Sequence, residues 1–196
     1  MSKILEEKKE QKRRAILKSA LNIFSSKGYH NTVIDDIAIQ ADLGKGTIYR
    51  YYKNKQSLFL AVIESNLDEI KRLILSAMSS KESDVIKNMR KYIEIYLKYF
   101  EKNKSFYNIL LHEKSEFKHE AFLRHRKKQI FLFEPLVQQG INEGKVKHLN
   151  SKSLTYALLG MMDAAIWKWL WSPKTYPITD EIPVILEIMK SGILKN

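Results

Sequence analysis

Residues 32–55, TVIDDIAIQADLGKGTIYRYYKNK, have the pattern of two short helices joined by a tight turn, and they decide the fold of this 196-residue chain. Thr32 and Asp35 resemble a capping box, with a hydroxyl and a carboxylate near the first free backbone N–H groups. The turn falls at residues 42–44, where Asp42 and Gly44 tolerate a positive φ. The apolar residues of the first helix recur at helical spacing: Ile34, Ile37, Ala38 and Ala41.

The second helix, about residues 45–52, has a composition that core packing does not explain. Only Ile48 and Tyr52 are spaced to point inward. The other positions supply cations, hydroxyls and a glycine, which suit a helix that lies in a DNA groove and contacts phosphates. We predict that Lys45 and Thr47 reach base edges or nearby phosphates, and that Arg50 faces solvent, the groove or a neighbouring helix. The predicted DNA-contacting residues are Thr32, Lys45, Gly46, Thr47, Tyr49, Arg50, Tyr51 and Lys55.

Residues 45–59, KGTIYRYYKNKQSLF, resemble the signature of the TetR family, and FSSKGY at 24–29 and DIA at 36–38 precede them at the family's distance. The sequence departs from the family at Gly44, where a Ser or Thr N-cap is usual. It also departs at Tyr52, where a buried Phe is usual, so we expect this hydroxyl to reach solvent or a partner. The resemblance implies an all-α fold with a three-helix DNA-binding domain at 1–55 and a helical effector-binding and dimerisation domain at 56–196.

Composition favours an anionic partner, since 34 Lys and Arg side chains outnumber 22 Asp and Glu and give a net charge of +12. Part of this charge is a basic run near the N-terminus, formed by Lys8, Lys9, Lys12, Arg13 and Arg14. This run is either a solvated helix end or an arm that contacts phosphates. The chain has no Cys, which excludes disulfides and thiolate zinc sites. The charged N-terminus lacks an apolar signal core, so we expect a cytoplasmic protein with no membrane segment.

The rest of the chain predicts further helices, about nine in all, with no strand pattern. Gly28 is a natural C-cap for the first helix, and Asn54 caps a long helix that ends near residue 80. Later helices are expected at about 84–102, 106–112, 118–143, 151–171 and 179–194. Pro135 should kink or divide the helix at 118–143 near Phe133.

The segment 151–171 is apolar on nearly every side, although Asp163 and Lys168 argue against a membrane span. Such a helix needs cover on more than one face, and a second subunit can supply it. Gly160, Ala164 and Ala165 would let another helix approach closely. In the TetR family the last two helices of each subunit form a four-helix interface, so the resemblance implies a homodimer through 151–171 and 179–194.

Aromatic and Met side chains between residues 92 and 167 suit an apolar cavity with a few polar groups. No Arg or Lys can be placed inside this lining, so we predict a small, largely apolar or aromatic effector. Asp163 is exposed, bonds across a dimer or orients a ligand. The predicted effector-binding residues are Tyr92, Tyr96, Phe106, Tyr107, Leu110, Phe131, Met162, Asp163 and Trp167.

One metal-like cluster, between His112 and Glu120, contains Glu-x-x-His, but it lacks the second pair that carboxylate-bridged metals need, so a solvated bend fits better. We find no P-loop, no nucleophile elbow and no cofactor motif. The sequence predicts a ligand-responsive transcriptional regulator that is not an enzyme. The resemblance to the TetR family implies a repressor that its effector releases from a palindromic operator. Two alternatives stay open, a DNA-binding protein without an effector and a helical enzyme that uses the aromatic cavity.

Overall fold

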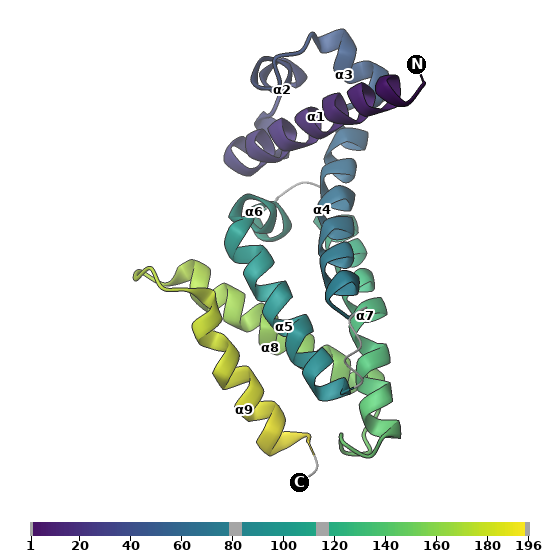
Figure 1. Ribbon diagram of the computed structural model, residues 1–196. Helices are drawn as coiled ribbons and strands as arrows, with labels where there is room; N and C mark the ends of the chain where they lie inside the picture. Colours follow the sequence, from purple (N-terminus) through teal and green to yellow (C-terminus); the bar gives the residue numbers. More distant parts are fainter. Residues whose placement is uncertain (1, 79–83, 113–117, 195–196) are drawn as a thin grey trace. The chain divides into compact units, whose positions relative to one another are not determined.

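A computed structural model describes residues 2–78, 84–112 and 118–194, and in these residues the chain is helical with no strand beyond an isolated bridge between Val146 and Leu194 (Figure 1). The all-α prediction is confirmed. The helices of the described residues are α1 (Ser2–Asn31), α2 (Ile34–Gln40), α3 (Lys45–Tyr51), α4 (Lys55–Met78), α5 (Val85–Lys102), α6 (Lys104–His112), α7 (Lys118–Asn142), α8 (Ser151–Trp171) and α9 (Ile182–Gly192), with a 3-10 turn at Ile178–Glu181 before α9.

The chain forms two compact units. The first unit comprises Met1–Asp68 and Lys104–Arg124, and the second unit comprises Glu69–Asn103 and His125–Asn196. Both α4 and α7 therefore contribute residues to both units. The boundary between residues 55 and 56 stays a prediction.

Helix α1 ends its regular run at Gly28, which has a φ of 74° and a ψ of 166°. This confirms Gly28 as the C-cap, because the left-handed region strains side-chain-bearing residues. Around this point Phe24, Tyr29 and Phe59 form an aromatic cluster, with ring centroids 5.1 Å apart for Phe24 and Phe59 and 5.2 Å apart for Tyr29 and Phe59. This cluster joins the end of α1 to the start of α4.

The two short helices form as predicted, but their caps differ. The N-cap of α2 is Val33, which makes no side-chain cap bond. The predicted capping box is therefore wrong, because Thr32 is buried and its hydroxyl donates to the Gly28 carbonyl at 2.7 Å. In the turn, Asp42 takes the positive φ, 53°. Gly44 is the N-cap of α3 without a side-chain bond, as the departure from the family pattern predicted.

Two further sequence expectations concern polar side chains in the first unit. Asn54 does cap α4, since its Oδ1 accepts the Ser57 N–H at 2.8 Å and its own N–H donates to the Ser57 hydroxyl at 3.1 Å. Tyr52 does not reach the expected partner: its hydroxyl oxygen is buried and has no hydrogen-bond partner in the part of the chain that is described. Burial raises the pKa of Tyr52, so the hydroxyl stays protonated.

In the second unit, capping side chains fix where the helices begin. Asp84 accepts the Ile86 N–H at the start of α5, and Asn150 accepts the Ser153 N–H at the start of α8. Helix α7 runs continuously through Pro135, so the proline does not divide it. The turn after α8 is held by Trp169, whose indole donates to the Tyr176 carbonyl at 2.8 Å. Of the described helices, none has the length and apolar character to cross a membrane.

Candidate functional site

Helix α3 is anchored by one residue and presents most of the others to solvent. Ile48 is 1% exposed and fixes the inner face, whereas Tyr49 is 47% exposed. Lys45, Gly46 and Arg50 are also exposed. A Cβ built on Gly46 would meet open space, so the backbone is uncovered on that side. The helix therefore displays cations, a phenol hydroxyl and bare backbone on one small surface, as a groove-reading helix requires.

Two exposed ion pairs link α2 to the residues around it. The Lys45 ammonium donates to Asp35 at 2.9 Å, and the Lys27 ammonium donates to Asp36 at 2.7 Å. The bond to Asp35 raises the pKa of Lys45, and the bond from Lys27 lowers the pKa of Asp36. Both pairs are open to water and therefore weak. Lys45 can exchange its carboxylate partner for a phosphate.

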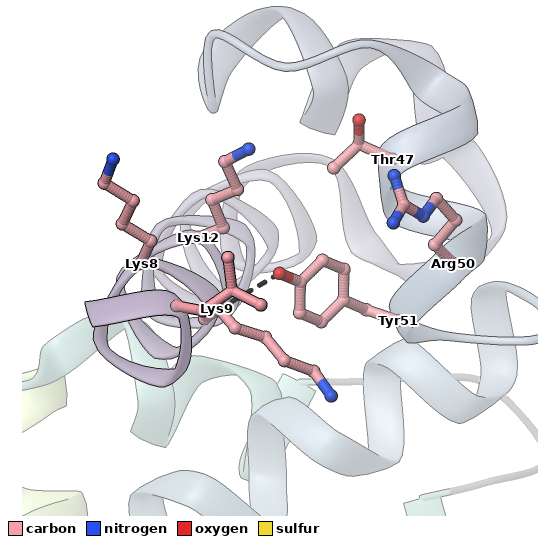
Figure 2. A pocket seen from close by; sticks show the side chains of 7 residues that line it. Lys8, Lys9, Lys12, Thr47, Arg50 and Tyr51 are labelled. Atoms are coloured by element: carbon pink, nitrogen blue, oxygen red, sulfur yellow. Dashed lines mark hydrogen bonds between the residues drawn. The ribbon is translucent and has the colours of Figure 1, made fainter. Parts of the chain in front are cut away.

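A concave pocket of about 450 Å³ lies between α1 and α3 (Figure 2). The Tyr51 hydroxyl donates to the Lys9 carbonyl at 3.1 Å and ties the two helices together there. Thr47 and Arg50 extend from α3 on the other side. The pocket is lined by Leu5, Lys8, Lys9, Lys12, Thr47, Arg50 and Tyr51. The predicted residues Thr47, Arg50 and Tyr51 are thus brought together with the basic run of the N-terminus.

Thr32 and Lys55 have intramolecular roles that the sequence did not predict. The Lys55 ammonium donates to the carbonyls of Tyr29 at 2.8 Å, Thr32 at 2.9 Å and His30 at 3.3 Å. It also lies 4.5 Å from the centre of the Tyr29 ring. A cation at the carbonyl end of a helix is stabilising. Thr32 and Lys55 therefore help to close the end of α1, and their contacts with DNA stay predictions.

The second unit contains a buried polar cluster on α5, α7 and α8, made of Tyr92, Tyr96, His125, Arg126, Gln129 and Asp163. The Tyr96 hydroxyl and His125 Nε2 are 2.8 Å apart, and Gln129 donates its amide to the same hydroxyl. Which group donates in the bond between Tyr96 Oη and His125 Nε2 is set by the tautomer of the imidazole. His125 Nδ1 and Gln129 Oε1 are buried and have no hydrogen-bond partner among the described residues.

Burial and charge set the protonation of this cluster. Burial, with a smaller contribution from the Arg126 cation, lowers the pKa of His125 to about 3. Its imidazole is therefore neutral at neutral pH. Burial also raises the pKa of Tyr92, and the nearby Asp163 charge adds to the effect. Burial raises the pKa of Asp163 despite the opposing effect of Arg126. The cluster offers a ligand neutral hydrogen-bonding groups beside one ion pair.

The ion pair corrects one expectation from the sequence. Arg126 donates to Asp163 from α7, and their side chains are only 14% and 23% exposed. A basic side chain therefore does lie among the predicted lining residues Tyr92, Tyr96 and Asp163. Asp163 bonds within its own chain, which none of its three expected roles described. A helical stripe at His125, Gln129, Leu132 and Leu136 would have revealed this inward face of α7.

The other six predicted effector residues are not members of this polar cluster. Phe106, Tyr107 and Leu110 are buried in α6 of the first unit, and Met162 is buried in α8. Phe131 and Trp167 are 68% and 42% exposed, with the Trp167 ring 5.1 Å from that of Trp171. Of the metal-like segment, residues 113–117 lie outside the described residues. No three His, Asp or Glu side chains in the described ranges are grouped as metal ligands.

An exposed stripe of apolar and small side chains runs along α8 and α9. On α8 it includes exposed Gly160 and Ala164, and on α9 Val184 and Ile188 are 56% and 50% exposed. Ala165, by contrast, is 7% exposed within its own chain. On α8 the stripe begins with the neighbours Tyr156 and Ala157 and then recurs at intervals of three or four residues at Gly160, Ala164, Trp167 and Trp171. These residues therefore share one helix face.

Comparison with known families identifies the two parts of the chain. Residues 16–62 match the profile of bacterial regulatory proteins of the tetR family, and residues 82–171 match a tetracyclin repressor-like C-terminal domain. The chain belongs to the TetR family of transcriptional regulators. It is therefore a DNA-binding transcription factor and not an enzyme, which removes the enzyme alternative.

Relatives cover nearly the whole chain. The fatty acid metabolism regulator protein of Bacillus subtilis is 22% identical over 192 residues, covering 94% of this chain and 97% of the relative. The crystal structure of FadR from Bacillus subtilis with stearoyl-CoA matches with a TM-score of 0.81 at 19% identity, over 92% of this chain and 98% of that one. A regulator from Saccharomonospora viridis in complex with choline matches with a TM-score of 0.80 at 16% identity, over 95% and 100%. These structures share the TetR fold.

Proposed function

We propose that the protein is a cytoplasmic, homodimeric repressor that leaves a palindromic operator when a small molecule occupies the second unit. The exposed surface of α3 carries this proposal, because Ile48 holds the helix while Lys45, Gly46, Tyr49 and Arg50 face outward. A dimer places two such helices in successive major grooves, so half-sites should be about 34–36 Å apart or somewhat more. Selection of bound sequences from a random duplex pool should return a palindrome, and a pool that gains no consensus would refute sequence-specific binding.

The exposed stripe on α8 and α9 supports dimerisation through these helices. Ala164 is exposed in the isolated chain, so Ala164→Asp should leave the subunit folded and place a charge in the interface. Ala165 is a poorer test, because it is buried within its own chain. Sedimentation should show a dimer for the wild type and a monomer for Ala164→Asp. Leu75→Asp, a change at a 46% exposed residue of α4, is the control and should stay dimeric. A wild-type monomer at micromolar concentrations would contradict the assembly.

The buried polar cluster supports an effector with a long apolar part and one polar or anionic head group. His125 Nδ1 and Gln129 Oε1 are buried polar atoms whose hydrogen bonds a ligand could complete, and an anionic head group could replace Asp163 beside Arg126. The complex of the related fold with stearoyl-CoA supports this class of molecule. Release of DNA requires that the effector bind the DNA-incompetent state more tightly. Because α4 and α7 each belong to both units, a shift in the second unit can pass along continuous helices to the first.

The effector proposal can be tested with stearoyl-CoA and stearate as probes and coenzyme A as the control. At least one acylated probe should release the selected operator and raise the melting temperature, whereas coenzyme A should do neither. Coenzyme A acting as well as stearoyl-CoA would refute the apolar requirement. Operator binding that no probe from a broad library of apolar compounds alters would favour the alternative of a DNA-binding protein without an effector.

A further inference from the structure

We propose that Arg126 binds the carboxylate of an apolar monocarboxylic acid, and that Asp163 holds the same position on Arg126 until the acid replaces it. The inference rests on the proposed effector function of the second unit and deepens it. It specifies a free acid, and not a coenzyme A thioester, as the class of effector. Asp163 is then an internal competitor that marks where the ligand's head group binds.

The group that now occupies the position on Arg126 is itself a carboxylate. Arg126 of α7 donates to Asp163 of α8, and both side chains are largely shielded from water. A guanidinium matches a carboxylate in shape and charge, and their attraction is stronger away from water. A ligand carboxylate can therefore make the bond that Asp163 makes now.

The charge of the cluster suits a ligand with a single negative charge. Among the described residues of the cluster, Arg126 is the only cation, because burial lowers the pKa of His125 to about 3 and keeps its imidazole neutral. Coenzyme A carries several phosphate charges, whereas the thioester carbonyl at its acyl end carries none. A thioester would therefore leave Arg126 without an anion and offer its phosphates no further cation in the cluster.

Buried rings beside the cluster can contact the apolar part of the acid. The ring of Phe133 lies 4.4 Å from that of Tyr92, and the ring of Phe100 lies 4.9 Å from that of Tyr96, measured between centroids. All four side chains are buried. An alkyl or aryl tail that extends from Arg126 along these rings would be removed from water, which favours binding.

The exchange should also bind one proton from solvent. Once the ligand holds Arg126, Asp163 is left buried without a cation, and its ionised form is unfavourable there. Burial already raises the pKa of Asp163 while Arg126 opposes the rise, so loss of Arg126 raises this pKa further. A protonated Asp163 has an O–H to donate, and Gln129 Oε1 nearby is a buried acceptor without a partner among the described residues.

The other titratable groups around Asp163 do not change charge near neutral pH. His125 of α7 stays neutral, and Tyr92 of α5 stays protonated because burial and the Asp163 charge raise its pKa. Further along α8, Lys168 is bonded to Glu181 at 2.8 Å. The proton therefore belongs to Asp163, and affinity for the acid should fall as the pH rises, by up to about tenfold per pH unit.

The test measures binding of dodecanoate, stearate, dodecanol and dodecanoyl-CoA by calorimetry at about pH 6.5 to 8.5, in two buffers with different heats of ionisation. The wild type should prefer a free acid and take up about one proton on binding it. Asp163→Asn removes the competitor together with the titrating group. It should bind the acid about tenfold more tightly at the high end of this range and take up no proton.

A second variant tests the role of Arg126. Removal of Arg126 alone would leave Asp163 buried and unpaired, so Arg126→Gln is combined with Asp163→Asn. This double variant should lose the preference for dodecanoate over dodecanol. The control replaces the exposed pair of Arg124 and Glu120 on the same helix, 2.8 Å apart, by Gln at both positions, and it should behave like the wild type. A double variant that keeps the preference, or acid binding without proton uptake, would overturn the inference.

The remaining outcomes separate this inference from the proposed function. Tighter binding of dodecanoyl-CoA than of dodecanoate would overturn the free-acid assignment and leave the effector function in place. The same holds if neither acid binds but other apolar compounds release the operator. Operator binding that no apolar compound alters would remove the effector function itself, and the inference with it.

Discussion

The two units use polar side chains in opposite ways. Around α3 the charges are exposed and their partners are exchangeable, as in the pair of Lys45 and Asp35, in which both side chains are about half exposed (52% and 56%). In the second unit, Tyr96, His125 and Gln129 are buried and bonded mainly to one another. Exposed charges cost little folding stability, because they stay hydrated, and they can bind a polyanion from solvent. Buried polar groups cost stability unless their bonds are complete.

This difference suggests a specific role for the unpaired buried atoms of the second unit. The incomplete bonds of His125 Nδ1 and Gln129 Oε1 have no structural purpose within the described part of the chain. A ligand that completes them would stabilise the second unit, and the exposed surface around α3 has no equivalent requirement. Substitutions of single polar groups test this difference between the two units.

The largest expected effect concerns the pH dependence of stability. Burial lowers the pKa of His125 from its ordinary 6.5 to about 3, so the unfolded chain binds more protons between these two pH values. The free energy of unfolding therefore falls as the pH drops from 6.5 towards 3, because protons bind His125 in the unfolded chain first. At about pH 4.5 this loss is roughly 3 kcal/mol. His125→Gln should lack this component in urea unfolding measured across pH. The exposed His30→Gln is the control, and identical profiles for His125→Gln and wild type would show that His125 is not buried as described.

A second effect tests whether every cation near α3 serves DNA. Lys55→Met removes three bonds to carbonyls at the end of α1 and should destabilise the fold by about 2 kcal/mol. Lys53→Met, at an exposed lysine two residues away, should leave stability unchanged. Chemical unfolding distinguishes the two. Unchanged stability in Lys55→Met, together with a reduced salt slope for DNA, would support the phosphate contact that the sequence suggested.

The smallest effect concerns the exposed pair on α2 and α3. Asp35→Asn removes the carboxylate that competes with phosphate for Lys45, so affinity for DNA should rise by about two- to fivefold at low salt. Asp42→Asn makes the same charge change in the neighbouring turn, and Asn tolerates the positive φ there. Because Asp42 bonds to neither lysine of the exposed pairs, its variant measures the general effect of charge. Equal gains for the two variants would show that the pair itself has no role.

Local spacing predicted the DNA-binding half of the molecule well. The break at Gly28, the cap at Asn54 and the inward position of Ile48 all follow from a few neighbouring residues. The role of Lys55 did not, because the carbonyls it binds are some 25 residues away in sequence and meet it only after folding. Thr32 was misassigned for a similar reason: a hydroxyl before a helix predicts an N-cap, but burial directed it to Gly28.

The candidate ligand site was only partly predictable. Tyr92, Tyr96 and Asp163 were identified from their apolar neighbours, but the cluster depends equally on His125, Arg126 and Gln129. Residues 118–130 contain many charges, and this composition predicts that the whole segment is exposed to solvent. The helix period, more than composition, decides which of these residues turn inward. Phe131 and Trp167 show the converse, since large aromatic side chains on a helix can remain exposed.

We propose that DNA binding belongs to the first unit and effector response to the second, so that each can be lost separately. The most direct measurement is the affinity for the selected operator with and without the effective acylated probe, in the wild type, Lys45→Ala and Tyr96→Phe. Lys45→Ala should bind DNA weakly yet keep the probe-induced rise in melting temperature. Tyr96→Phe should bind DNA normally yet resist release. Loss of both properties in either folded variant, or release from DNA that Tyr96→Phe leaves unchanged, would contradict the account.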